Sequence, residues 1–179
     1  KEGKKIAGYQ YQGYWEDIGT IRSYFESNLA LADDLPAFDL FNNKNIIYTR
    51  PRMLAPSKIF GTSVSQSVIA EGCILRAKVI DHCLIGIRTR IGEGTMIKDC
   101  IVFGNDSYQS LEEITKAEAN NQTLKGIGEN CHIERAIIDK EVFVGNNVVI
   151  RGHESLEDAT EEKYVIRDGI IVLKKGVYS

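Results

Sequence analysis

The stretch IGIRTRIGEGTM at residues 85–96 decides the fold, because it contains two successive copies of one six-residue unit. In each copy an aliphatic residue is followed by glycine, two turn-forming or polar positions and a small side chain. The unit returns as IGENCH at residues 127–132 and as VGNNVV at residues 144–149. A period of six belongs neither to an α-helix nor to an alternating strand, and it indicates an internal repeat.

Aliphatic residues continue this rhythm, at steps of five or six, over most of the chain. Six residues suffice for a short strand and a turn, so three units would close one coil of a triangular prism, with the aliphatics stacked as interior ladders. We therefore predict a mainly β fold, a left-handed parallel β-helix of hexapeptide repeats. The ladder residues are Val64, Ile69, Leu75, Ile80, Ile85, Ile91, Ile97, Val102, Ile127, Ile133, Ile138, Val144 and Ile150.

Small residues at the fifth position of the unit should also lie inside the narrow prism, and we expect this of Thr89, Thr95, Cys131 and Val148. The repeat stops over residues 103–125, a polar stretch with some helix propensity, which we interpret as a loop extruded from one corner. The residues 164–173 predict two final strands around an Asp-Gly turn that cap the open end of the stack.

The part of the chain before the repeat does not show the six-residue period. Residues 9–15 are aromatic-rich and favour a strand, and Thr20 stands where it would cap a short amphipathic helix from Ile21 to Ala32. We divide the chain into 1–41, a short α/β tail; 42–57, a proline-containing extended linker; and 58–179, the β-helix domain.

Composition excludes several classes of protein. The net charge of −3 argues against binding to nucleic acid, and no apolar run is long enough to cross a membrane. The N-terminus lacks the apolar stretch of a signal peptide, so we expect a cytoplasmic protein.

The four cysteines fit neither a zinc-ribbon nor a redox spacing, and we expect them to be reduced and structural. We interpret the three histidines as solvated or locally hydrogen-bonded rather than as metal ligands.

Two features could carry chemistry. Asp17, between an aromatic segment and a helix, could hold Mg²⁺ with phosphate oxygens and water, although it could equally cap the following turn. Basic residues are scattered over separate elements: Arg50 and Arg52 flank a proline, Lys140 follows a ladder, and Lys175 follows the last strand. Convergence of these cations would make a site for a phosphorylated small molecule, whereas solvated surface charge is the alternative.

Six motifs together resemble the C-terminal part of the ADP-glucose pyrophosphorylase family, also called glucose-1-phosphate adenylyltransferase. They are GYWEDIGTI at 13–21, YTRPR at 48–52, PSK at 56–58, GIGEN at 126–130, AIIDK at 136–140 and DGIIV at 168–172. The resemblance extends over nearly the whole chain. It implies an N-terminal nucleotidyltransferase domain that makes ADP-glucose and pyrophosphate from ATP and glucose-1-phosphate, the committing step of glycogen or starch synthesis.

The resemblance also implies roles for individual residues. Asp17 would be one of two aspartates that hold the catalytic Mg²⁺. Arg52 and Lys140 match phosphate-contacting positions, and Lys175 matches an activator-binding lysine. Arg50 stands where many relatives have a polar amide, which indicates a more basic effector pocket. The chain contains no glycine-rich nucleotide loop, so we expect this part alone to be inactive in adenylyl transfer.

The partners that the resemblance implies are the protein's own N-terminal catalytic domain, further copies in a homotetramer, and phosphorylated effectors. An alternative is a free-standing hexapeptide-repeat acyltransferase, a trimer that would use His82 or His132 as a base. A metal-dependent hydratase on the same scaffold is a third hypothesis. The aromatic-acidic segment around Asp17 has no place in either of these enzymes.

Overall fold

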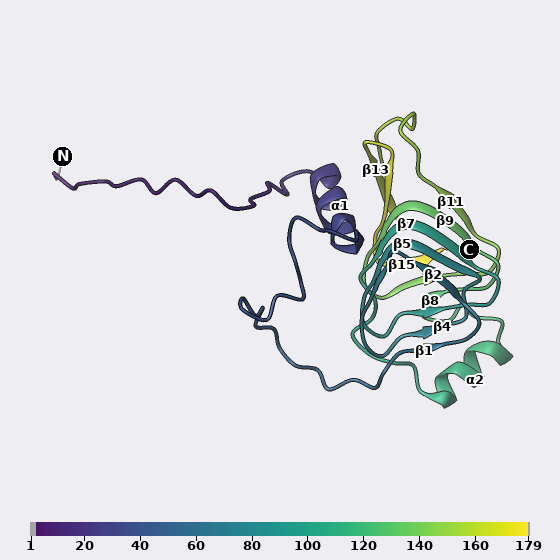
Figure 1. The fold of residues 1–179 in the computed structure, drawn as a ribbon. Helices are drawn as coiled ribbons and strands as arrows, with labels where there is room; N and C mark the ends of the chain where they lie inside the picture. Colours follow the sequence, from purple (N-terminus) through teal and green to yellow (C-terminus); the bar gives the residue numbers. More distant parts are fainter. Residues whose placement is uncertain (1–2, 179) are drawn as a thin grey trace.

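A computed structural model describes residues 3–178, and its main body is a parallel β-helix (Figure 1). One sheet forms one face of the prism, and its strands follow one another in parallel as β1, β4, β6, β8, β10 and β15. Their bounds are Lys58–Ile59, Ile74–Leu75, Arg90–Ile91, Gly126–Ile127, Val142–Val144 and Gly176–Tyr178. The mainly β, parallel architecture predicted from the repeat is thus confirmed.

The second sheet wraps around a corner and supplies the other two faces. Its long strands β5 (Val79–Ile85), β7 (Met96–Val102) and β9 (His132–Ile138) pair in parallel. Each bends at a residue with positive φ, namely His82, Asp99 and Arg135. The short strands β2 (Ser63–Ser65) and β3 (Val68–Ile69) pair with β5, and β11 (Val149–Arg151) pairs with β9.

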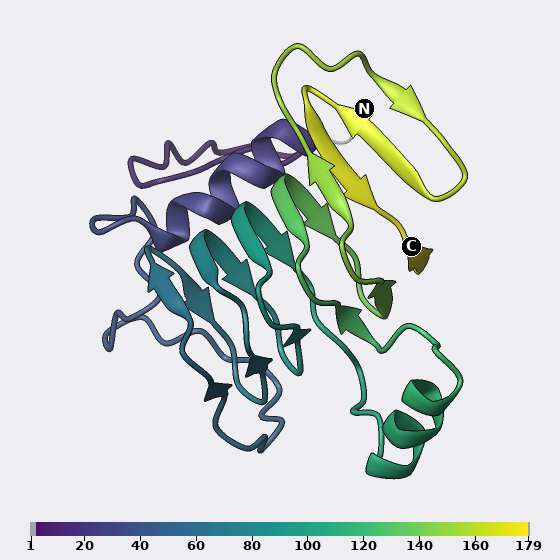
Figure 2. The same ribbon diagram turned by 90° about the vertical axis from the view of Figure 1, so that its right-hand side faces the viewer.

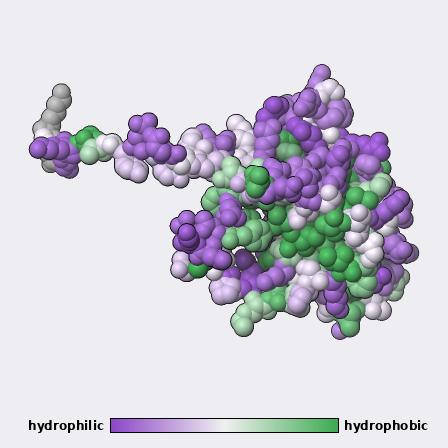
Figure 3. All heavy atoms as spheres, in the orientation of Figure 1, coloured by the Kyte–Doolittle hydropathy of each residue, from purple (hydrophilic) through white to green (hydrophobic). Residues whose placement is uncertain are grey.

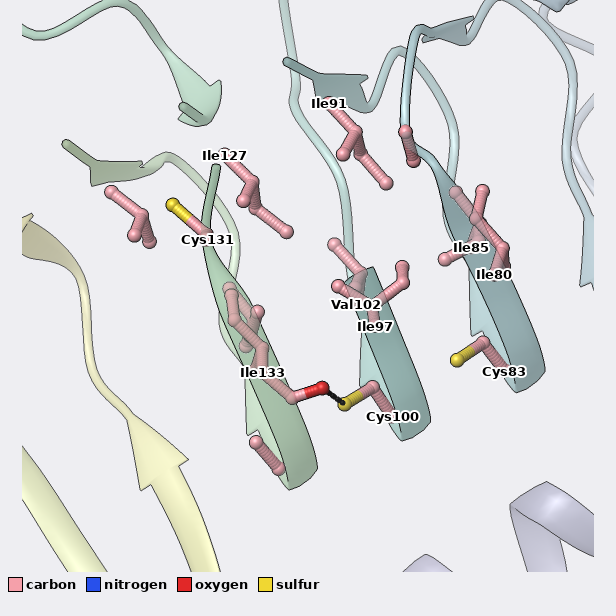
Figure 4. Close-up of a cluster of buried hydrophobic side chains, with 14 of the residues drawn as sticks. Ile80, Cys83, Ile85, Ile91, Ile97, Cys100, Val102, Ile127, Cys131 and Ile133 are labelled. Carbon is pink, nitrogen blue, oxygen red and sulfur yellow. Dashed lines mark hydrogen bonds between the residues drawn. The ribbon is translucent and has the colours of Figure 1, made fainter. Parts of the chain in front are cut away.

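The interior of the prism consists of three ladders of stacked aliphatic side chains, one from each face (Figure 4). Ten of the predicted ladder residues are buried, and Ile69 and Ile150 are partly buried against them, which confirms the assignment. The register gives the ladders as Val64, Ile80, Ile97, Ile133, Ile150; then Ile69, Ile85, Val102, Ile138, Leu173; and Leu75, Ile91, Ile127, Val144, Tyr178.

Val64 departs from the prediction, because its side chain remains 40% exposed. Its strand lies at the edge of the sheet, so Ile80 covers it from one side and no further coil covers the other. Ile59 and Phe60 in the same first coil are also about half exposed, at 51% and 48%. Apolar surface accordingly occupies the middle of the face shown in Figure 3.

The small interior positions behave as predicted at Thr89, Thr95 and Cys131, which are buried, while Val148 is partly buried. The two threonine hydroxyls donate hydrogen bonds of 2.7 Å to backbone carbonyls of glycine, so neither polar group is left unsatisfied inside the prism. All four cysteines are buried free thiols. The prediction of reduced, structural cysteines is therefore confirmed.

The predicted N-terminal helix is present as α1 (Ile21–Leu29), continued by one 3₁₀ turn over Ala30–Ala32. The hydroxyl of Thr20 accepts a hydrogen bond from the backbone N–H of Ser23, and Ser23 returns one to form a capping box. Phe25 and Leu29 bury the inner face of α1 against side chains that point outward from β7 and β9. Figure 2 shows α1 crossing the stacked coils.

The strand favoured by residues 9–15 is not formed, and this part of the tail is extended and exposed. A strand needs a hydrogen-bonded neighbour, and no residue within 3–178 pairs with this segment. Residues 42–57 likewise contain neither helix nor strand. The domain boundaries proposed from the sequence stay predictions.

The interruption at residues 103–125, called the inserted segment below, is interpreted from the sequence as a loop with some helix propensity, and the structure forms a helix within it, α2 (Leu111–Ala119). It begins at Ser110 with a second capping box and stands away from the prism (Figure 2). No helix among residues 3–178 has the length and apolar character needed to cross a membrane.

The end of the chain forms the predicted hairpin. Strands β13 (Tyr164–Arg167) and β14 (Ile170–Leu173) are antiparallel, and the short β12 (Ala159–Thr160) pairs with β13. Asp168 and Gly169 both have positive φ in the turn between them, as a type I′ hairpin turn requires. Because β14 also pairs with β9, the hairpin continues the sheet beyond the last long coil.

Candidate functional site

Three parallel strands end side by side at one corner of the prism. Val102 of β7, Ile138 of β9 and Leu173 of β14 are register partners. Lys140 follows Ile138 by two residues, and Lys175 follows Leu173 by two residues. Neighbouring strands are about 4.8 Å apart, so the backbones of these two lysines are brought close together although they are far apart in the sequence.

Asp106, which follows β7 in the inserted segment, lies against Lys140. Its Oδ1 accepts a hydrogen bond from Nζ of Lys140 at 2.9 Å. That bond, with the positive charges of Lys140, Lys175 and Arg52, holds the pKa of the Asp106 carboxyl below its ordinary value. Three of the four basic residues singled out from the sequence therefore act on one carboxylate, and we call Arg52, Lys140 and Lys175 the cation cluster.

The backbone of Asp106 is fixed by a second contact. Its N–H donates to Oε1 of Glu141 at 2.6 Å, and Oε2 of Glu141 pairs with Nζ of Lys125, also at 2.6 Å. Partial burial opposes ionisation of Glu141, yet the hydrogen bonds from Lys125 and from the Asp106 N–H hold the pKa of this carboxyl below its ordinary value. Both ends of the inserted segment are thus anchored beside the cation cluster.

The sequence analysis missed Asp106. Its only signal in a single sequence is its position just after the point where the ladder stops, which many solvated residues share. Nothing local marks it as the partner of a lysine that lies beyond the whole inserted segment. Asp106 and Lys140 are far apart in the sequence, and only the folded chain brings them into contact.

Arg50 is not brought into the cluster. Its side chain is exposed and makes no ion pair with any residue from 3 to 178, and its charge is not among those that act on Asp106. The effector-binding role predicted for Arg50 stays a prediction.

Asp17 is exposed, and its Oδ1 accepts a 3.0 Å hydrogen bond from the backbone N–H of Gly19. This contact forms an Asx turn that leads into the Thr20 cap, so the local structural role considered from the sequence is present. The other carboxylate oxygen remains available as a single metal ligand. Within residues 3–178 no three His, Cys, Asp or Glu side chains gather around a common point where a metal ion could bind. Further ligands would have to come from outside this part of the chain.

The histidines of the acyltransferase hypothesis are engaged with carboxylates. Nδ1 of His82 lies 2.6 Å from Oδ1 of Asp99, and its Nε2 lies 3.7 Å from Oδ1 of Asp33. His132 has Nε2 at 3.7 Å from Oε2 of Glu134. The imidazole of His82 therefore ties the end of the α1 segment to a corner of the prism, and no observation favours a catalytic role for it.

Comparison with protein families agrees with this architecture. The family model described as "GLGC left-handed parallel beta-helix domain" matches residues 52–178. The match begins at Arg52 and includes every strand of the prism as well as Lys140 and Lys175. It also assigns the left-handed sense predicted from the hexapeptide repeat.

Proposed function

Because the chain belongs to the GLGC left-handed parallel β-helix domain family, a C-terminal part of ADP-glucose pyrophosphorylase, we propose that it regulates and helps assemble such an enzyme. This is a family of nucleotidyltransferases. The proposed reaction of the intact enzyme converts ATP and glucose-1-phosphate into ADP-glucose and pyrophosphate, for glycogen or starch synthesis in the cytoplasm.

The observation that carries the proposal is the cation cluster at the corner of the prism. Arg52, Lys140 and Lys175 come from three separate parts of the chain, and their charges converge on the carboxylate of Asp106. A phosphate group carries more negative charge than one carboxylate and offers several acceptor oxygens. It is therefore well suited to receive charge-assisted hydrogen bonds from this cluster, which we propose as the site for phosphorylated effectors.

The same proposal gives the N-terminal residues a place in the enzyme. Residues 1–41 would be the end of the catalytic domain, and Asp17 would hold Mg²⁺ together with residues outside this chain. When bound, that ion would neutralise phosphate charge during adenylyl transfer. Helix α1, which buries Phe25 and Leu29 on the outer face of the prism, would join the two domains firmly.

We further propose that the β-helix takes part in a homotetramer of the intact enzyme and that this chain alone does not catalyse adenylyl transfer. Size measurement by light scattering tests the assembly, and production of pyrophosphate from ATP and glucose-1-phosphate tests the inactivity. In the intact enzyme, pyrophosphate release that persists in the Asp17→Asn variant would argue against the proposed metal ligand.

Phosphate binding to the 179-residue chain, measured by isothermal titration calorimetry, tests the effector site directly. We expect the double variant Lys140→Ala, Lys175→Ala to lose at least ten-fold in affinity for a phosphorylated sugar at the cluster. The matched control is Lys78→Ala with Lys98→Ala, two exposed lysines for which no side-chain contact within residues 3–178 is observed. Equal losses in both double variants, or no loss in the first, would refute the assignment.

A further inference from the structure

A hollow of about 610 Å³ lies on the outer face of the β4, β6, β8 and β10 strands, under the end of the inserted segment. Its outer wall is formed by residues 121–125, which return from α2 to the prism. The cation cluster takes none of its three members from the lining of this hollow. The hollow thus has its own set of polar groups.

The floor is open because β8 has no side chains on either side of its ladder residue. Ile127 points inward and is buried, and its two neighbours are Gly126 and Gly128. A Cβ at Gly126 would stand 3.1 Å from the Cβ of Arg90 and 2.5 Å from its backbone oxygen. These contacts are too close for a side chain, so β8 itself projects no side chain from Gly126 into the hollow.

Two guanidinium groups face this space from adjacent coils. Leu75 and Ile91 are buried register partners, so Arg76 and Arg90, which flank them, point outward. Arg76 and Arg90 lie on neighbouring strands and are offset by two residues along them, so their Cα atoms are about 8 Å apart. Two arginine side chains can reach one phosphate across this distance.

Neither guanidinium is neutralised by the protein. No hydrogen bond or ion pair joins the side chain of Arg76 or of Arg90 to any acceptor within residues 3–178. Arg76 lies over the ring of Phe60 at 4.7 Å, a contact that orients its planar group but leaves its N–H donors free. Two planar fork donors without a partner in the described part of the chain thus line one hollow, and such donors suit a phosphate group.

The rest of the lining suits a polar, hydroxyl-bearing body. Glu118 and Glu129 offer carboxylates whose side chains make no hydrogen bond within residues 3–178, and Asn121, Gln122 and Thr123 add amide and hydroxyl groups. Carboxylates accept hydrogen bonds from sugar hydroxyls, and amides both donate and accept. A bare inorganic anion would leave these groups without partners.

We propose that this hollow is a second binding site, for a phosphorylated sugar, whose phosphate lies between Arg76 and Arg90 and whose hydroxyls reach the carboxylates of Glu118 and Glu129. The site is independent of the effector pocket proposed above, because it shares none of the three cations of the cation cluster. The inserted segment supplies its wall, which gives this interruption of the repeat a binding role.

The test uses a 179-residue chain that already carries Lys140→Ala and Lys175→Ala, so that two of the three cations of the cation cluster are removed. Titration of this background with glucose 6-phosphate should still show one bound ligand. Adding Arg76→Gln and Arg90→Gln should weaken the binding at least ten-fold. The control is Arg151→Gln, which removes an exposed arginine of β11 and should leave the affinity unchanged.

A second pair of variants tests the sugar part of the proposal. Glu118→Gln with Glu129→Gln should weaken glucose 6-phosphate binding while leaving inorganic phosphate binding intact, and glucose alone should not bind measurably. Arg76, Glu118 and Glu129 are exposed and Arg90 is half-buried, and equal melting temperatures would show that the variants fold. No glucose 6-phosphate binding in the background, or binding that survives loss of both arginines, would overturn the site. Equal affinity for phosphate and glucose 6-phosphate would overturn the ligand class.

Discussion

The substitution Ile97→Ala gives the sharpest test of the ladder assignment, because this side chain is stacked between two others in the middle of the prism. Ile97 is 0% exposed, and its register partners Ile80 and Ile133 are also 0% exposed. Alanine removes three buried carbons, each worth about 0.8 kcal/mol of transfer free energy. The coils on both sides are held by backbone hydrogen bonds and cannot close the gap, so a cavity cost is added.

We therefore expect Ile97→Ala to lower the free energy of unfolding by about 3–4 kcal/mol, within the range of about 2–5 known for such truncations. Val64→Ala, in the same ladder, is the matched control. It removes two carbons from a side chain that is 40% exposed at the end of the stack, where no cavity forms, and should cost about 1 kcal/mol or less.

Urea unfolding followed by far-UV circular dichroism measures both values. For a chain of this length the central substitution should lower the melting temperature by roughly 6–16 °C, since 1 kcal/mol corresponds to about 2–4 °C. Similar losses at the two positions would show that burial does not increase toward the middle of the ladder. A loss below about 1 kcal/mol at Ile97 would refute an interior position.

Two further predictions concern ionisable groups. The hydrogen bond from Lys140 holds the pKa of Asp106 below its ordinary 3.8, so the carboxylate stabilises the fold above that value and loses this effect as the pH falls through its lowered pKa. The difference in unfolding free energy between the parent and Asp106→Asn should be present at neutral pH and shrink in acid; a constant difference would contradict the ion pair. Burial raises the pKa of the Cys73 and Cys131 thiols, so dithionitrobenzoate at mildly alkaline pH should label them only after unfolding in urea, and rapid labelling of the native chain would contradict their interior position.

Much of the fold could be predicted because its signal is local and repeated. Each aliphatic ladder residue is followed within the same unit by its turn residues, as at residues 91–96. The caps of the two helices are local as well, since Thr20 and Ser110 each bond within their own first turn. Elements of this kind depend on neighbours in the sequence, and a single sequence contains the information to place them.

The prediction failed where an element depends on what lies beside it. The aromatic residues 9–15 favour extended structure, but no strand within residues 3–178 pairs with them. Val64 has the ladder spacing, yet it is the last of its stack and stays partly exposed. Periodicity indicates which side of a strand faces inward, whereas the coverage of that side is set by the next coil.

The candidate sites divide in the same way. The sequence by itself identified Arg52, Lys140 and Lys175 as cations worth examining, and it determined the prism because burying a regular aliphatic row gives one favourable register. Only the tertiary structure decided that Asp106 meets Lys140 and that Arg76 and Arg90 share a hollow. Charged side chains on the surface are not part of the buried aliphatic repeat, so no periodic pattern in the sequence marks where they lie. Their positions are set by the register of the coils and by the path of the inserted segment.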